Sequence, residues 1–355
     1  MMPTYNRQPF ALRNMQYWSG RGVTVRVLDG SDHPISSSLL SGLGSNIIYK
    51  HEQCSFVQRL NKVLPEIDTE YVALIGDDEF YIPSAVEACI SELDLEPSLV
   101  ACCGRALGFY TLDGIVYGRK KYPKLERYSL LQDDPSERIS SHMRDYVPSL
   151  IYAIVRVSQW KRAIHSYTEK EFPIFAIGEI QVEMCLSFSG KSRVLPHLMW
   201  LRCSSDSPKI QCTDVSLSPE TVFPQWWSSS KNSEDREIFI QILSRAFEDL
   251  NAEYQGDYRL AVSDACMAYL QFYAERQDSR KVRGLAYLIH SISYRFPSFL
   301  KIFIKSILFK LFKKFPPAYS FIDMASELEN TGVRVDFEAL VKIEKIILSE
   351  CRNLR

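Results

Sequence analysis

The sequence lacks the features that define several classes of protein. Nine cysteines are present, but no two stand at CxxC spacing and most lie within apolar runs. This pattern predicts reduced, buried thiols rather than a disulfide framework or a structural zinc site. No stretch holds 18 consecutive apolar residues, and the opening MMPTYNRQPF has no apolar signal-peptide core. We therefore expect a cytoplasmic protein.

Net charge is also nearly absent. The 42 Lys and Arg residues almost balance the 43 Asp and Glu residues, which gives a formal charge of -1. A chain built to neutralise many phosphates would carry more positive charge, so we expect no nucleic-acid partner. What the chain does have is 355 residues, of which 46% are hydrophobic and 24% charged. That balance is typical of a globular protein with one large domain or two modest ones.

Short apolar strands alternate with amphipathic helices over the first 150 residues. The pattern predicts strands over 23–28, 71–75 and 99–103, and helices over 54–64 and 83–93. Such alternation is typical of the α/β class with a mostly parallel sheet covered on both faces. In these sheets, ligands bind beyond the carboxyl ends of the strands.

Helices dominate the last third of the chain. Residues 204–234 are rich in Ser and Pro, which indicates a linker and places a boundary near residue 230. Beyond it, the periodicity predicts helices over 237–254, 258–277 and 335–349. We thus predict an α/β domain over 1–230 and a helical region over 231–355.

An acidic run follows the apolar strand YVALI. Asp77, Asp78 and Glu79 come directly after Gly76, at the mouth of a buried strand. Three adjacent acids repel one another, and a divalent cation would relieve that repulsion. Oxygen ligands suit Mg²⁺ or Mn²⁺, either of which could bridge a diphosphate. The alternative is a solvated acidic turn, for which Gly-Asp-Asp is also suitable.

Two more strand ends carry polar groups suited to a nucleotide. Pro3-Thr4-Tyr5-Asn6-Arg7 supplies a hydroxyl, an aromatic face, an amide and a guanidinium. The segment VTVRVLDGS places Asp29 where a carboxylate could accept hydrogen bonds from a base or a ribose. Either motif alone is compatible with an ordinary loop.

In order and approximate spacing, PTYNR, VRVLDGS and ALIGDDEF resemble the family-2 glycosyltransferases. They are also similar to a related bacterial subfamily whose acidic motif is followed by an aromatic residue and a proline, here Phe80 and Pro83. The resemblance covers about the first two thirds of the chain. It implies a GT-A fold, a nucleotide-sugar donor and a Mn²⁺ or Mg²⁺ cofactor.

The resemblance also implies roles for individual residues. Pro3 and Arg7 belong to the first nucleotide-binding motif. Those that would bind the base, the nucleotide or the ribose are Thr4, Tyr5, Asp29, Arg59 and Asp77. Asp78 and Glu79 would hold the metal, with Glu79 in place of the more usual third Asp.

A second carboxylate pair lies further along the chain. Glu179 and Glu183 are four residues apart, and therefore share one face if the segment is helical. By resemblance, Glu179 occupies the position of the catalytic base and Glu183 is the second candidate; the alternative is two surface charges. Arg202, at the end of a predicted strand, could pair with a donor phosphate or form a structural ion pair. Trp226 and Trp227 could stack on a sugar or pin a loop.

Together these features predict transfer of a sugar from a nucleotide-sugar to an acceptor hydroxyl, with inversion at the anomeric carbon. The pathway implied by the resemblance is bacterial surface glycan biosynthesis, such as lipopolysaccharide or capsule. A nucleotidyltransferase would carry a glycine-rich phosphate loop, and PTYNRQPF contains no glycine. A non-catalytic nucleotide-sugar-binding scaffold is the alternative from another class.

One segment concentrates positive charge. Residues 297–317 (PSFLKIFIKSILFKLFKKFPP) hold five lysines and no acid. As a helix, the segment would have a continuous apolar face, which suits the interface of an anionic membrane. It would place the protein on the inner face of the cell membrane, beside a glycan or lipid-linked glycan acceptor. The alternative is a packed helix whose lysines extend to water.

Overall fold

The first sheet of the computed structural model is parallel and lies at the N-terminus. The structure describes residues 1–204, 222–281 and 319–353. Strands β1 (Met2–Thr4), β2 (Val25–Asp29) and β3 (Ile47–His51) pair in the order β1-β2-β3. Residues 73–75 run beside β1, because the Met1 amine donates to Ala73 O at 2.7 Å and Ile75 N donates to Met1 O at 3.0 Å.

Three helices surround this sheet. They are α1 (Gln8–Trp18), α2 (Ser37–Leu40) and α3 (Phe56–Val63). Helix α3 begins at a capping box, in which Ser55 Oγ accepts from Gln58 N and Gln58 Oε1 accepts from Ser55 N. The short turn Leu64–Glu66 then leads to β4 (Tyr71–Val72) and the acidic run.

The second sheet has eight strands and is mixed. Its main path is β11-β7-β6-β10-β5, and β4, β8 and β9 pair off this path. Besides β4, its strands among the described residues are β5 (Phe80–Tyr81), β6 (Leu99–Leu112), β7 (Ile115–Lys120), β8 (Ser129–Leu130), β9 (Ile154–Arg156), β10 (Lys191–Cys203) and β11 (Tyr319–Ser320).

The α/β class and the helical C-terminal region are confirmed, whereas a mostly parallel arrangement holds only for the first sheet. In the second, β6 and β10 are the only strands of the described residues that pair in parallel. The physical reason is clearest at β6 and β7. They are joined by Asp113 and Gly114, both at positive φ, and such a tight turn returns the chain antiparallel.

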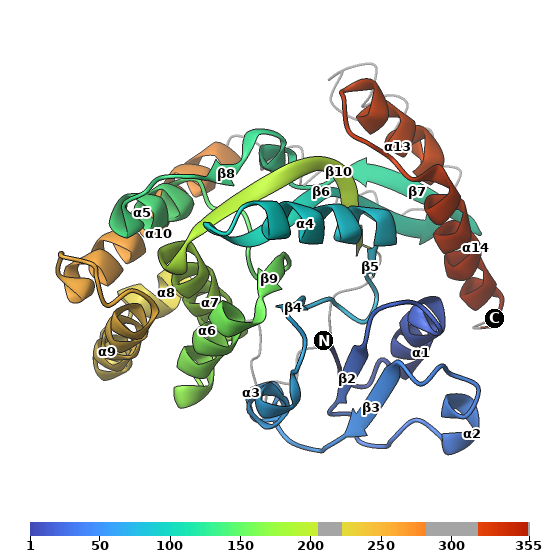
Figure 1. Cartoon of the computed structure of the whole chain (residues 1–355), viewed down its shortest axis with the longest axis horizontal. Coiled ribbons are helices and arrows are strands. Elements are labelled where there is room, and N and C mark those ends of the chain that lie inside the picture. Colours follow the sequence, from blue (N-terminus) through green and yellow to red (C-terminus); the bar gives the residue numbers. More distant parts are fainter. Residues whose placement is uncertain (205–221, 282–318, 354–355) are drawn as a thin grey trace.

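Helices α4, α5, α6 and α7 cover the second sheet and its end (Figure 1). Their bounds are Pro83–Leu95, Pro135–Arg144, Val157–Glu169 and Phe175–Ser189. Gly178 lets α6 and α7 approach closely, since a Cβ there would lie 2.0 Å from Tyr167 Cε2. This contact fixes the start of α7 directly before Glu179, which lies just beyond the first turn of the helix.

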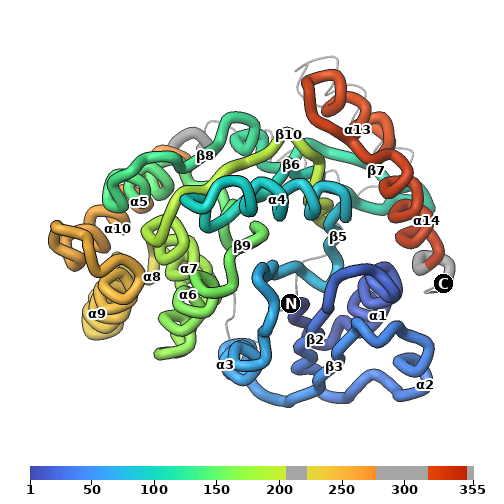
Figure 2. The backbone as a smooth tube through the Cα atoms, viewed as in Figure 1, coloured from blue at the N-terminus to red at the C-terminus, as the bar shows by residue number. Residues whose placement is uncertain are grey.

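The C-terminal helical region packs against two separate parts of the α/β unit (Figures 1 and 2). Helices α8 (Phe223–Ser228), α9 (Ser233–Leu250) and α10 (Tyr258–Lys281) lie beside α5, α6 and α7. Helices α13 (Phe321–Asn330) and α14 (Phe337–Asn353) instead pack on β7 and α1. The described helices of the predicted region 231–355 therefore pack in two separate places, and the boundary near residue 230 stays a prediction. In the part of the chain that the structure describes, no helix is both long and apolar enough to cross a bilayer.

Candidate functional site

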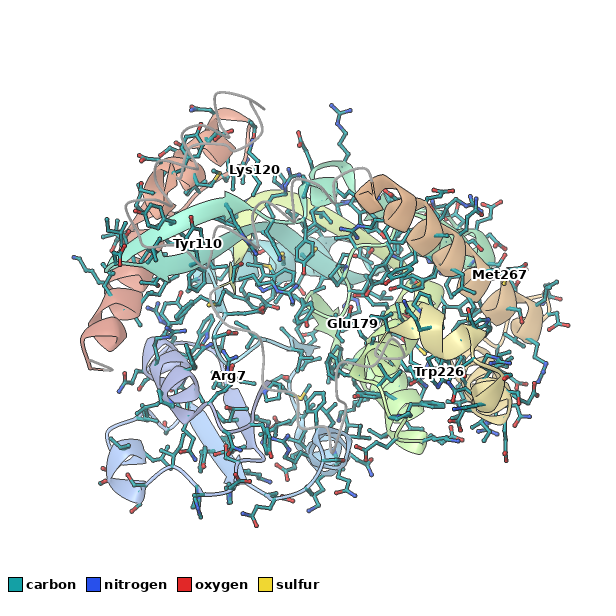
Figure 3. All side chains as sticks on the ribbon, turned by 180° about the vertical axis from the view of Figure 1, so that it is seen from behind. Arg7, Tyr110, Lys120, Glu179, Trp226 and Met267 are labelled. Carbon is teal, nitrogen blue, oxygen red and sulfur yellow. The ribbon has the colours of Figure 1, made fainter. Side chains whose placement is uncertain are left out.

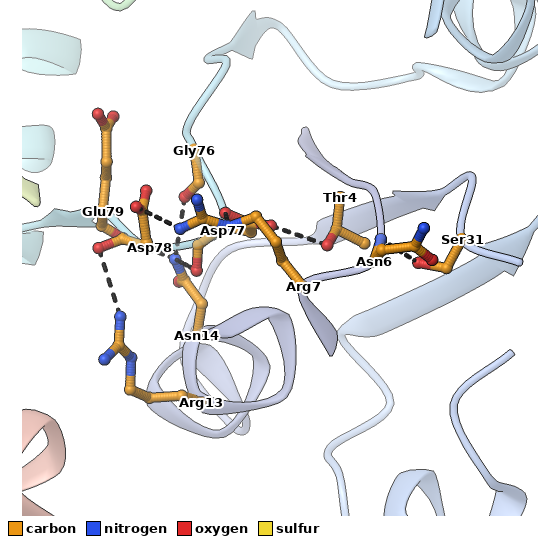
Figure 4. Close-up of polar contacts among 10 residues, drawn as sticks. All are labelled: Thr4, Asn6, Arg7, Arg13, Asn14, Ser31, Gly76, Asp77, Asp78 and Glu79. Carbon is orange, nitrogen blue, oxygen red and sulfur yellow. Dashed lines mark hydrogen bonds and ion pairs between the residues drawn. The ribbon is translucent and has the colours of Figure 1, made fainter. Parts of the chain in front are cut away.

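The structure brings the three N-terminal motifs together at one edge of the first sheet. Thr4 and Asp29 are register partners at the carboxyl ends of β1 and β2. Thr4 Oγ1 donates to Asp77 Oδ2 at 2.8 Å, and Asn6 N donates to Ser31 Oγ at 2.8 Å. Segments far apart in the sequence thus meet through direct hydrogen bonds (Figure 4).

The side chains of Asp29 and Arg59 are buried beneath this edge of the sheet. Asp29 is fully buried, and its carboxylate accepts from Ser31 N at 2.8 Å and from Tyr49 OH at 2.5 Å. Arg59 is also buried and donates to Thr4 O at 3.0 Å and to Leu28 O. Both side chains hold the strand ends in place, and their contact with a nucleotide stays a prediction.

Arg7 occupies the space between the first two acids of the triplet. Its Nε lies 3.2 Å from Asp77 Oδ1, and its Nη2 lies 2.5 Å from Asp78 Oδ2. The guanidinium also lies over the Phe10 ring, at 4.5 Å from its centroid. Burial raises the pKa of Asp77 to about 6, against the opposing effect of Arg7. The repulsion between these acids is therefore offset by a side chain of the protein itself.

Asn14, on α1, binds backbone carbonyls of the acidic turn. Its Nδ2 donates to Glu79 O at 2.6 Å and lies 3.3 Å from Gly76 O. The residue is fully buried, so it fixes the turn without contacting solvent. Sequence reasoning missed Asn14, and a single amide within a helix gives no local signal of such a role.

Glu79 points away from Arg7, toward the second sheet (Figure 4). Its Oε2 accepts from Trp200 Nε1 at 2.8 Å, and its Oε1 lies 3.2 Å from Arg202 Nε. Burial raises the pKa of Glu79 to about 7, and the charge of Asp78 adds to that rise. The structure therefore shows Arg202 in an ion pair with Glu79, which was one of the two roles expected for it from the sequence.

Trp200 is the centre of an aromatic stack that sequence reasoning did not find. Its ring stacks on Tyr122 at 5.3 Å and on Tyr152 at 4.5 Å between centroids. The Arg202 guanidinium lies over all three rings, within 6.0 Å of each centroid. We call Tyr122, Trp200 and Tyr152 the aromatic stack.

Glu179 lies on α7, apart from Arg7 of the first motif (Figure 3). Tyr146 OH donates to its Oε1 at 2.6 Å. Burial raises the pKa of Glu179 to about 7, against the lowering effect of the Tyr146 hydrogen bond and with a smaller rise from the charge of Glu183. Burial and the charges of Glu179 and Glu79 also raise the pKa of Tyr152.

Glu183 has a different environment. It is fully buried and accepts from Leu150 N at 3.2 Å, from Ile151 N at 3.1 Å and from His142 Nε2 at 2.8 Å. Glu183 is therefore not a surface charge. Its carboxylate ties α7 to the chain that precedes β9, and of the two carboxylates only Glu179 is partly exposed.

Of the remaining candidate residues, Trp226 packs in the core, whereas Pro3 and Tyr5 lie at the edge of the first sheet. Trp226 is buried against Phe172 and Phe239, which fits a role in packing. Pro3 lies in β1, and Tyr5 is partly exposed just beyond it. The groove of about 590 Å³ between α6 and α9 lies away from these motifs.

The described residues offer few ligands for a metal ion. No group of three His, Cys, Asp or Glu side chains is arranged among them to hold one. Both Glu79 oxygens already bind Trp200 and Arg202, whereas Asp78 binds Arg7 and is 15% exposed. Magnesium often takes only one or two carboxylates and receives its other ligands from phosphates and water. Asp78 fits that kind of site, and a metal role for Glu79 stays a prediction.

Comparison with known proteins finds similarity only among solved structures. No family model matches the chain, and no curated protein matches it. Three structures of S. aureus TarS 1-349 are similar at 13% identity, over 78% of this chain and 90% of theirs. The TM-scores are 0.43 for the complex with UDP-GlcNAc, 0.41 for TarS 1-349 alone and 0.40 for the complex with UDP. At this degree of likeness, the comparison carries no inference about the site or its ligand.

Proposed function

We propose that this protein is a glycosyltransferase that moves a sugar from a nucleotide-sugar donor to an acceptor hydroxyl. The observation that carries the proposal is the meeting of three motifs at one sheet edge, through the hydrogen bonds from Thr4 to Asp77 and from Asn6 to Ser31. Glu179, a carboxylate with a raised pKa, adds a candidate general base.

Glu179 is the proposed general base. The acceptor oxygen attacks the anomeric carbon, its proton passes to Glu179, and the bond from that carbon to the donor phosphate oxygen breaks. A pKa of about 7 matches this task, because the carboxylate is available near neutral pH and still accepts a proton well. One base and one in-line attack give inversion at the anomeric carbon.

Tyr146 and Glu183 position the base. The Tyr146 hydroxyl holds one Glu179 oxygen at 2.6 Å, and Glu183 fixes the next turn of α7 through two backbone amides. The first contact orients the Glu179 side chain and the second anchors its helix before substrate arrives, which lowers the ordering cost of the reaction.

A divalent cation remains part of the proposal, with Asp78 as its protein ligand. Bound there, Mg²⁺ or Mn²⁺ would neutralise negative charge on the leaving diphosphate. Arg7 would have to share or release Asp78 Oδ2, which it now contacts at 2.5 Å. If a metal binds there, Asp78→Ala should abolish turnover, and a chelator should abolish turnover of the wild type. Full turnover of the wild type in excess chelator would contradict a metal requirement.

The acceptor class follows from the sequence resemblance and from the lysine-rich segment 297–317, which lies outside the described residues. We propose a glycan or lipid-linked glycan acceptor, in bacterial surface glycan biosynthesis on the inner face of the cell membrane.

A panel of sugar nucleotides tests the central proposal. Purified full-length protein is incubated with UDP-, GDP-, dTDP- and CMP-sugars and manganese, and free nucleotide is measured without acceptor. Slow hydrolysis of one donor is the expected result. Release of pyrophosphate from a nucleoside triphosphate and a sugar phosphate would favour a nucleotidyltransferase. Binding of a donor without turnover, even with candidate acceptors, would favour a scaffold.

A further inference from the structure

Lys121 is a cation beside the proposed site. It follows β7 directly and is partly exposed, with its Nζ 5.2 Å from the Tyr122 ring centroid. Within the described part of the chain, Lys121 makes no hydrogen bond and no ion pair. Burial, together with the charges of Arg202 and Arg119, lowers the pKa of Lys121 to about 8, against the opposing effect of Glu79.

Arg202 brings a second cation to the same place. Its guanidinium lies 5.4 Å from the Tyr122 centroid, the ring that Lys121 also contacts. The carboxylate that faces both cations is Glu79, which is ion-paired with Arg202 and lowers the cost of charge on Lys121. Two cations thus share one carboxylate, and another anion would be bound favourably.

The backbone next to Lys121 is held in a costly conformation. Tyr122 has φ 47° and ψ 58°, the left-handed region that aromatic residues rarely adopt. Within the described ranges, the only other non-glycine residues at positive φ are Asn6, in the first motif, and Asp113, in the β6–β7 turn. Such a conformation is unfavourable by itself and persists where surrounding contacts impose it. Here those contacts are the stacking of Tyr122 on Trp200 and the proximity of both cations to its ring.

The location of this pair relates it to the proposed reaction. Glu79, which pairs with Arg202, lies two residues beyond Asp77, and Asp77 accepts a hydrogen bond from Thr4. Lys121 and Arg202 therefore lie close to the nucleotide motifs. In a nucleotide-sugar, the group between the nucleoside and the reacting carbon is the diphosphate.

We propose that Lys121 and Arg202 form a binding site for a phosphate-type anion at the edge of the aromatic stack. The part of this proposal that concerns catalysis rests on the proposed function: the cations would neutralise charge on the departing nucleoside diphosphate. The anion comes either from the donor diphosphate or from a phosphate group on the acceptor.

Inorganic pyrophosphate is the probe for this site. Its binding to the full chain is measured by calorimetry at low ionic strength, without metal or sugar nucleotide. We expect Lys121→Met to weaken binding at least tenfold and Lys121→Arg to retain it. The matched control is Lys120→Met, because Lys120 is the adjacent lysine and pairs with Glu327 at 2.7 Å instead. Wild-type protein that binds no pyrophosphate, or a Lys121→Met variant that binds it as tightly as wild type, would overturn the proposal.

A competition experiment identifies the source of the anion. If a sugar nucleotide that the enzyme hydrolyses displaces pyrophosphate, the site holds the donor diphosphate. If both bind together, it holds a phosphate of the acceptor, and either outcome supports an anion site. If no sugar nucleotide is hydrolysed, the proposed function fails. The pyrophosphate titration still tests the anion site, because it does not depend on turnover.

Discussion

Glu179 is the side chain whose replacement should separate chemistry from binding. Glu179→Gln keeps the size of the side chain and removes its basicity, so turnover should fall by about a hundredfold or more while donor affinity survives. Steady-state kinetics and donor titration measure the two effects. A Glu179→Gln enzyme at the wild-type rate, together with an inactive Glu183→Gln variant, would show that the base was assigned to the wrong carboxylate.

The same carboxyl should also link stability to pH. Its pKa is about 7 in the folded protein against a usual 4.5, so between these values the folded state binds more protons than the unfolded chain. The contribution of Glu179 to the free energy of unfolding should therefore fall as pH rises from about 4.5 to 7, by at most about 3 kcal/mol. Urea unfolding across this range measures the slope. Glu179→Gln should flatten it, and an identical slope in both proteins would contradict the raised pKa.

Helix α7 depends on close contact with α6. In Gly178→Ala the new Cβ would lie 2.0 Å from the ring of Tyr167, which is buried and cannot move freely. Overpacking costs about 1–3 kcal/mol and helix propensity returns up to about 1 kcal/mol, so we expect a net loss of stability. Activity should fall as well, because Glu179 is the next residue.

Chemical denaturation and nucleotide-release assays measure both effects of Gly178→Ala. Gly42→Ala is the control, since a Cβ at Gly42 has no atom within 4 Å. An unchanged unfolding midpoint in Gly178→Ala would mean that α6 and α7 accommodate the methyl group.

At the scale of the whole molecule, the last helices complete the α/β unit. Phe321 is fully buried at the start of α13 and packs edge-on against Phe109 of β6, at 6.0 Å between centroids. Phe321→Ala should cost about 3–5 kcal/mol through lost burial and a cavity. Leu260→Ala, at a side chain that is 58% exposed, is the control and should change little. If thermal unfolding of Phe321→Ala matched that of the control, α13 would be peripheral to the core.

The lysine-rich segment 297–317 gives a second prediction at this scale. Its five lysines and apolar residues predict salt-sensitive binding to anionic vesicles. Changing Lys310, Lys313 and Lys314 to Glu should weaken that binding, as measured by vesicle sedimentation at low salt. Equal recovery of wild type and triple variant in the soluble fraction would instead favour a packed helix.

The sequence by itself determined the elements and the motifs. Apolar periodicity predicted strands that appear in β2 and β6 and helices that correspond to α4, α9 and α10, because burial imposes these periods locally. The order of the three N-terminal motifs also indicated a shared sheet edge, since parallel strands end on the same side.

Only the tertiary structure decided which charges meet. Spacing suggested that Asp77, Asp78 and Glu79 face one cation, yet Arg7 pairs with the first two while Glu79 turns to Arg202. Glu183 was the second candidate for the base after Glu179, and the structure buries it fully and pairs it with two backbone amides. Lys121 gave no sequence signal at all. The physical reason is that charge neutralisation and pKa depend on distance and burial in space, and segments far apart in the chain set both.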